Sequence, residues 1–238
     1  MSSRAEPGRS SSQDLGDLSD LDDDVCSALL ANARTKDLEA NAVIYFQEDA
    51  TEYLYILLSG HIRLTYIGED GFVTLYNIIS AGRSFGESGL LDNLPHCDTA
   101  STIGPARVMG IDASWIRQDG AAQAAVRQAL AQLVAQRYRQ HMQFTRALYF
   151  PSLSQRLAYL LGGLLDAMGN DLAYRGSRVL CLGPEVTQRD LGVMARGTRE
   201  NVNKTLRRWQ KDGILALEDR HIIVLDRDRL DNLAINLD

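Results

Sequence analysis

The chain has 238 residues, of which 45% are hydrophobic and 24% charged, and its formal net charge is −6. This balance is typical of a globular protein with one large or two modest domains. No apolar stretch approaches the ~20 residues of a membrane span, and no secretory signal is visible, so we expect a cytoplasmic protein. Three scattered cysteines, Cys26, Cys97 and Cys181, exclude a disulfide framework, and no residue pattern indicates a metal site or an enzyme.

Residues 1–24 are rich in serine and then in aspartate, with almost no aromatic or β-branched side chains. Such a segment buries too little surface to offset chain entropy, so we expect a disordered acidic tail, at least as far as Leu18. A first helix is predicted over Val25–Ala33. The aspartates before it are suited either to a divalent ion or, as we prefer, to the positive N-terminal end of this helix.

Short segments rich in β-branched and aromatic residues follow, separated by turn sequences. They predict a short helical turn at Glu87–Leu91 and strands in the ranges 42–46, 53–58, 61–66, 72–79 and 99–111. Many short strands at this spacing are typical of an antiparallel barrel or jelly roll. We therefore expect residues 25–113 to form one antiparallel β-domain.

One long helix is predicted next, over about Ser114–Tyr149 within residues 114–150. Steps of four and three residues give it a heptad stripe of Val126, Leu130, Leu133, Arg137, Gln140 and Phe144. Such a stripe can pack on its own domain, but over this length we favour a two-fold dimer. The predicted interface consists of Val126, Leu130, Leu133, Arg137 and Phe144. The sequence Phe150-Pro151-Ser152 then ends the helix and predicts a hinge.

The segment from Val186 to Lys211 predicts two short helices joined by a tight turn. The first covers about Gln188–Ala195, the turn is Arg196-Gly197, and the second begins after the N-cap Thr198. Helical spacing turns Val202, Leu206 and Trp209 toward the core. The opposite face then presents Arg199, Glu200, Asn203, Lys204 and Arg207. An apolar back and a front of hydrogen-bonding, mostly basic side chains are what a recognition helix needs in a DNA major groove.

Charge and the following residues support this interpretation. Residues 185–211 contain three acidic and seven basic side chains, a net charge of +4 within a chain of net charge −6. A local basic patch is the expected electrostatic footprint of nucleic-acid binding. The segments 214–217 and 221–225 then predict a β-hairpin, the wing of a winged helix-turn-helix domain over residues 151–238. A dimer would place two such domains on half-sites about 34 Å apart.

The order of these elements resembles the CRP/FNR family of bacterial transcription regulators. The likeness covers nearly all of Val25–Leu225 and is carried by LYILLSGHIRL (54–64), FGESGLLDN (85–93), SLSQRLAYLL (152–161) and VTQRDLGVMARGTRENVNKTLRRWQKDGIL (186–215). It implies an α+β fold with an N-terminal β-roll that senses an effector, a dimerisation helix and a C-terminal winged helix-turn-helix. It also implies a homodimer, double-stranded DNA as ligand and RNA polymerase as protein partner.

The resemblance implies particular DNA contacts as well. Arg199, Glu200 and Lys204 match the residues with which the cyclic-AMP receptor branch reads its half-site, Arg holding guanine and Glu accepting from cytosine. We therefore expect a palindrome related to TGTGA half-sites, more relaxed where Lys204 replaces an arginine and its planar fork. Thr187, Arg189 and Thr198 match phosphate-contacting positions, which set register.

The effector pocket departs from that branch. Gly86 and Glu87 are present, but Asp98 and Thr99 stand where cyclic-nucleotide binders carry a phosphate-binding Arg and its neighbour, and His141 and Met142 stand at the adenine-contacting positions. Because Asp98 would repel a phosphate, we expect an effector other than cyclic AMP, or none.

Other effectors stay open at this point. An iron-sulfur cluster needs four cysteines, mostly near the N-terminus, where only Cys26 lies. His96-Cys97 could ligate haem, although we prefer His96 as a loop residue and Cys97 as a small buried hydrophobe. Cys97 or Cys181 could be a redox thiol, and a cyclic-nucleotide-responsive regulator or an architectural DNA-binding protein are the remaining alternatives.

Overall fold

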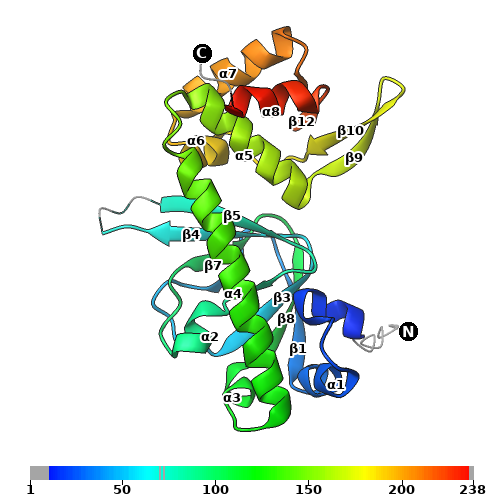
Figure 1. Ribbon diagram of the computed structural model, residues 1–238, viewed down its shortest axis with the longest axis vertical. Helices are drawn as coiled ribbons and strands as arrows, with labels where there is room; N and C mark the ends of the chain where they lie inside the picture. The colour runs from blue at the N-terminus through cyan, green and yellow to red at the C-terminus, as the bar shows by residue number, and fades with distance from the viewer. Residues whose placement is uncertain (1–10, 70, 72, 236–238) are drawn as a thin grey trace, which may run out of the picture. The chain divides into compact units, whose positions relative to one another are not determined.

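The computed structural model describes residues 11–69, 71 and 73–235 (Figure 1). The chain divides into two compact units: one comprises the residues up to Leu64 together with Asn77–Gln136, and the other comprises Thr65–Tyr76 and the residues from Arg137 onward. Helices accompany antiparallel sheets in the described residues, so the predicted α+β class is confirmed. In the same part of the chain, no helix is both long and apolar enough to cross a bilayer.

The strands of the β-roll form two four-stranded sheets, ordered β1-β8-β3-β6 and β2-β7-β4-β5. Their bounds are β1 (Ala33–Leu38), β2 (Val43–Tyr45), β3 (Tyr53–Ser59), β4 (His61–Ile67), β5 (Val73–Ser80), β6 (Ser84–Phe85), β7 (Thr99–Thr102) and β8 (Ala106–Asp112). Four of the five predicted strand ranges each match one strand, apart from Phe72, which lies outside the described residues, while the range 99–111 contains two strands, β7 and β8, in different sheets. The expected helical turn is α2 (Ser88–Asp92). β1 was not predicted because its sequence, ARTKDL, is polar and mostly exposed.

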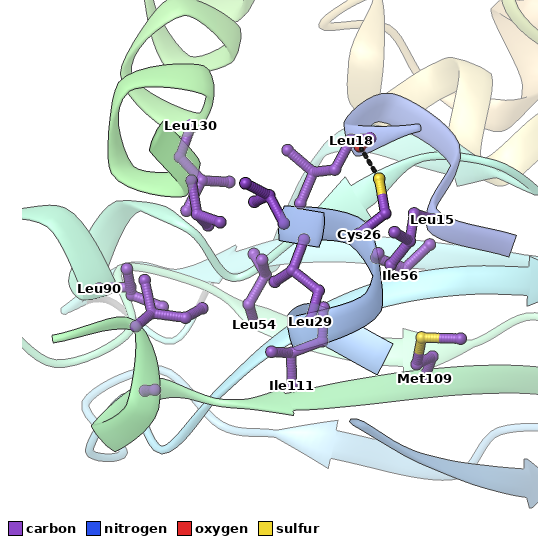
Figure 2. Packing of buried hydrophobic residues seen from close by; sticks show 14 residues of the cluster. Leu15, Leu18, Cys26, Leu29, Leu54, Ile56, Leu90, Met109, Ile111 and Leu130 are labelled. Carbon is purple, nitrogen blue, oxygen red and sulfur yellow. Dashed lines mark hydrogen bonds between the residues drawn. The ribbon is translucent and has the colours of Figure 1, made fainter. Parts of the chain in front are cut away.

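The expectation of a disordered tail is wrong for residues 11–24, while residues 1–10 lie outside the described part. A 3-10 helix, η1 (Ser12–Leu18), places Leu15 and Leu18 in the core with 0% and 1% of their surface exposed (Figure 2). The Cys26 thiol of α1 (Asp23–Ala31) donates to the carbonyl oxygen of Leu21 at 3.2 Å. Asp17 accepts from Arg83 Nη1 at 3.0 Å. Two buried leucines, the ion pair and the hydrogen bonds of Asp17 with Gly82 and Ser84 hold this otherwise polar segment on the β-roll.

The predicted long helix is interrupted. α3 (Ala113–Ile116) is capped by Asp112, which accepts from Ser114 N at 2.7 Å, and α4 (Ala121–Ala147) begins after a four-residue break. Arg127 on α4 donates to the carbonyl oxygen of Gln118 at 2.9 Å and so fixes the break.

Two residues of the predicted dimer interface belong instead to the core of their own chain. Val126 and Leu130 are fully buried and pack in one cluster with Leu54 and Ile111 (Figure 2), so the prediction of a partner contact is wrong for both. Leu133 is half-buried against the same cluster. Arg137 is half-buried and has an interaction within the chain, and the side chain of Phe144 lies outside the described part. The heptad stripe exists, but its N-terminal half, with Val126 and Leu130, packs on the β-roll.

The second unit contains the remaining elements: α5 (Leu153–Met168), β9 (Asn170–Tyr174), β10 (Ser177–Leu182), α6 (Gln188–Met194), α7 (Arg199–Lys211), β11 (Leu215–Glu218), β12 (His221–Val224) and α8 (Arg227–Ile235). Its sheet has the order β11-β12-β10-β9. The predicted wing is the β11–β12 hairpin, whose turn residues Asp219 and Arg220 both have positive φ, as a two-residue hairpin turn requires. Arg227 donates to Asp166 and Asp231, which ties α8 to α5.

Replacing Leu18 with alanine tests whether η1 is part of the core. Leu18→Ala should lower the free energy of unfolding by roughly 2–5 kcal/mol, because a fully buried leucine leaves a cavity. Gln13→Ala on the exposed side of η1 is the matched control and should change little. Urea unfolding followed by circular dichroism measures both. Equal stability of the two variants would contradict the assignment of η1 to the core.

Candidate nucleic-acid interface

The two helices α6 and α7 form the predicted helix-turn-helix. Thr187 and Asp190 make a capping box at the start of α6: Asp190 N donates to Thr187 Oγ1 at 3.1 Å, and Thr187 Oγ1 donates to Asp190 Oδ2 at 2.7 Å. In the turn, Gly197 N donates to Gly192 O at 2.8 Å. A Cβ on Gly192 would lie 2.9 Å from Gly197 O, so the close approach of the two helices requires glycine there.

α7 has the apolar back that the sequence predicted. Its N-cap Thr198 accepts from Asn201 N at 3.2 Å, and Val202, Leu206 and Trp209 are buried. Trp209 is among the largest fully buried side chains of the described residues. The prediction of the start and the core-facing side of this helix is therefore confirmed.

The opposite face of α7 is an exposed basic surface. It carries five basic side chains and one acidic one, within a chain of net charge −6. A concave surface along the helix is lined by Arg199, Glu200, Asn203, Lys204, Thr205, Arg207, Arg208 and Lys211. All five residues predicted for the side of α7 that faces DNA are thus together, four of them exposed and Asn203 half-buried. We call these five, Arg199, Glu200, Asn203, Lys204 and Arg207, the recognition row.

The three residues predicted to contact phosphates differ in which hydrogen-bonding groups of their side chains are still available to DNA. Arg189 is exposed. Thr198 uses its oxygen as an acceptor in the N-cap, and that bond leaves its hydroxyl proton available to a phosphate. Thr187 donates its hydroxyl proton to Asp190, so it acts mainly on the position of α6. The contacts themselves stay predictions.

Three polar side chains that the sequence did not single out hold the helix-turn-helix in place. Arg156 on α5 donates to the carbonyl oxygens of Ala195 and Phe150, both at 2.8 Å, and so joins the turn to the predicted hinge. Arg208 Nη2 donates to Ser154 Oγ at 2.8 Å. Gln188 accepts from Asn203 Nδ2 at 2.9 Å. No local pattern marks the pairs of Arg156 with Ala195, Arg208 with Ser154 and Asn203 with Gln188, because their members lie 15 to 54 residues apart.

Buried carboxylates stand at the predicted effector pocket of the β-roll. Gly86 has φ +80 and lies against the rings of His96, Tyr45 and Tyr55. Glu87 and Asp98 are 8% and 7% exposed. Thr99 Oγ1 accepts from the backbone N of Gln47 at 2.9 Å. The last two predicted pocket residues, His141 and Met142, are exposed on α4. Asp98, at the position where cyclic-nucleotide binders carry an arginine, is thus a buried acidic group, and the nature of the effector stays a prediction.

The prediction of His96 as a loop residue is confirmed, whereas the prediction of Cys97 as a buried side chain is wrong. Within its loop His96 is buried and stacks on Tyr45, with ring centroids 3.6 Å apart. Burial lowers the pKa of His96, and its Nδ1 has no hydrogen-bond partner among the described residues. Cys97 is exposed. A histidine ring packed flat inside an aromatic cluster does not fit an axial haem ligand.

The remaining thiols do not favour redox chemistry. Desolvation raises the pKa of Cys97, and the nearby carboxylates Asp98 and Glu87 raise it further. Burial also raises the pKa of Cys181. A thiol with a raised pKa is a poor nucleophile at neutral pH. Within the described residues, no group of three or more His, Cys, Asp or Glu side chains could hold a metal ion.

An amphipathic second helix with a basic front, held in a two-helix unit and followed by a β-hairpin, defines a winged helix-turn-helix DNA-binding protein. Comparison with protein families agrees. A cyclic nucleotide-binding domain matches residues 35–118, and a Crp-like helix-turn-helix domain matches residues 155–233. The chain belongs to the CRP/FNR family of transcription regulators, and it is therefore a regulator and not an enzyme.

Known proteins resemble it over most of their length. The chain is 24% identical to a CRP-like cAMP-activated global transcriptional regulator of Mycobacterium tuberculosis, over 86% of this chain and 89% of that protein. It is 27% identical to the cyclic AMP receptor protein of Thermus thermophilus, over 82% and 85%. The structure of FixK2 from Bradyrhizobium japonicum superposes with a TM-score of 0.73 at 24% identity, over 87% of this chain and 99% of that one.

Arg199 is the residue whose removal tests the recognition row. Arg199→Ala should lower selective DNA binding by roughly ten- to a hundredfold, because a two-bonded Arg–guanine contact discriminates by about 1–3 kcal/mol. Fluorescence anisotropy on a selected duplex and a scrambled one measures the loss. Arg178→Ala, an exposed arginine on β10, is the control and should bind as wild type. Retained selectivity in Arg199→Ala would contradict the assignment.

Proposed function

We propose that this regulator binds, as a homodimer, a palindrome related to TGTGA half-sites and contacts RNA polymerase in the cytoplasm, without activation by cyclic AMP. The recognition row is the observation that carries the proposal. Arg199 and Glu200 supply a guanine-binding fork and a cytosine acceptor in the first turn of α7, whose N-terminal end enters the groove in helix-turn-helix proteins. Arg189 and Thr198 are placed at the adjoining helix starts to bind phosphates.

The dimer interface that we propose is the face of α4 opposite to its buried stripe. At 100° per residue, the side chains that point away from Val126 and Leu130 are Ala124, Ala131, Ala135, Tyr138 and Met142. Tyr138 is 63% exposed and Met142 46%, both among the exposed large hydrophobic residues of the chain. Steps of seven, four, three and four residues form a heptad seam of their own. Its alanines allow two helices to approach closely.

The effector differs from cyclic AMP in this proposal, or is absent. Two relatives are named for cyclic AMP, and their sensor domain is shared in outline. In this chain the buried carboxylate Asp98 stands at the position of the phosphate-binding Arg, while Gly86 and Glu87 are retained. An anion placed beside the buried Asp98 loses its hydration and gains repulsion, which disfavours binding. The ring of His96 further fills the space beside Gly86.

Binding to DNA with and without nucleotide tests the function and its control together. The purified full chain is measured by fluorescence anisotropy on a TGTGA palindrome and on a scrambled duplex, each with and without cyclic AMP. We expect selective binding that cyclic AMP does not change. Equal binding to both duplexes, with a steep salt dependence, would indicate an architectural protein instead. Selectivity that appears only with cyclic AMP would overturn the proposed role of Asp98.

A charge on the exposed face of α4 tests the dimer. Tyr138→Asp should convert dimers to monomers, because it places a charge in the centre of an apolar seam. Light scattering after size-exclusion chromatography gives the molar mass. Gln132→Glu, an exposed position on the flank of the same helix, is the control and should stay dimeric. Dimers of unchanged stability in Tyr138→Asp would contradict the proposed interface.

A further inference from the structure

A hydrogen bond between two amide side chains joins the helices of the helix-turn-helix. Asn203 Nδ2 donates to Gln188 Oε1 at 2.9 Å, and both residues are half-buried. Gln188 is the first residue of α6. Asn203 lies one turn after Arg199 and one turn before Arg207 on α7, so it occupies the middle of the recognition row. The bond therefore fixes a neutral amide among charged side chains.

The groups that this bond leaves unused match one base. A primary amide has two N–H donors and one carbonyl acceptor. Gln188 takes one N–H of Asn203, so a second N–H and Oδ1 remain for an external partner. In the major groove, adenine offers the complementary pair, an acceptor at N7 and a donor at N6. A phosphate only accepts hydrogen bonds and would leave Oδ1 without a donor.

We propose that Gln188 is a positioning residue that holds Asn203 in the orientation in which Asn203 recognises an adenine in each half-site. This rests on the proposed function, because it requires a specific DNA site. An unrestrained asparagine would lose rotamer freedom when DNA binds. The bond to Gln188 orders the side chain beforehand, so less of the contact energy is lost in ordering it. Base selectivity at one position of the half-site then depends on a residue of α6.

The experiment measures selectivity base by base. A preferred site is selected from random duplexes with the wild-type dimer, and each position is then changed to the other three base pairs. Asn203→Ala should lose the preference for adenine at one position, roughly tenfold, and keep the others. Gln188→Leu, of similar size but without an acceptor, should lower the same preference severalfold. The double variant should be no worse than Asn203→Ala, because the two side chains act as one unit.

Further variants separate a positioning role from a merely structural one. Gln188→Glu keeps an acceptor for Asn203 Nδ2 and should keep the adenine preference, although its charge lowers the overall affinity. Gln210→Ala removes a half-buried amide elsewhere on α7 and should leave all preferences unchanged. Asn203→Ala should also leave the salt dependence of binding unchanged, whereas Arg207→Ala should reduce its slope by about one.

Each outcome decides between the proposals. A uniform loss of affinity at every position in Gln188→Leu would show a structural role only and overturn the inference. A lost preference for a base other than adenine would overturn it as well. A wild-type protein that selects no site would overturn the proposed function. A selective wild type whose preferences survive in Asn203→Ala would overturn this inference alone.

Discussion

The DNA-binding surface depends on the burial of one side of α7. Val202, Leu206 and Trp209 leave water together, and three such side chains contribute several kcal/mol in favour of one orientation of the helix. Once that side is fixed, helical geometry leaves the recognition row a single direction in which to point. The polar side of α7 is exposed to solvent because its apolar side is buried. No further interaction of the polar side chains is needed to expose them.

Polar contacts then set the position of α7 more finely than packing can. The approach of Gly192 to Gly197 brings the two helices together, and it tolerates no side chain. Arg156 holds the carbonyl oxygen at the end of α6 and that of Phe150 in the hinge. If the predicted hinge moves, it must either break these charge-assisted hydrogen bonds or carry the turn with it. One guanidinium group thus joins the backbone at Phe150 to the turn of the helix-turn-helix.

Much of this organisation could be predicted from the sequence, because periodicity and turn chemistry are local. Most strands of the β-roll, the wing and the two faces of α7 follow from patterns within a few residues, whereas the polar β1 and the two-residue β6 do not. Which part of the structure covers an apolar stripe depends on residues far away in the sequence. The heptad at Val126 and Leu130 gave the spacing of a buried face correctly, but the β-roll covers it, and not a partner. η1 was missed because two leucines among aspartates do not reveal the core they enter. The stacking of His96 on Tyr45 joins a loop to strand β2, 51 residues away in sequence, so no pattern near His96 predicts its burial.

On α7, charge contributes mainly to the affinity for DNA, whereas hydrogen bonding contributes to selectivity between sequences. Five basic side chains attract any DNA, and the acidic remainder of the chain disfavours approach by its other faces. That attraction is the same for every sequence, so it cannot discriminate. Discrimination requires groups that are satisfied by one base edge and left unpaired by others, which costs most for side chains that are already held in place. In the function that we propose, Glu200 and Asn203 of the recognition row are such groups. Glu200 lowers the attraction to phosphate and Asn203 leaves it unchanged, so their presence among basic side chains favours a surface that reads sequence as well as charge.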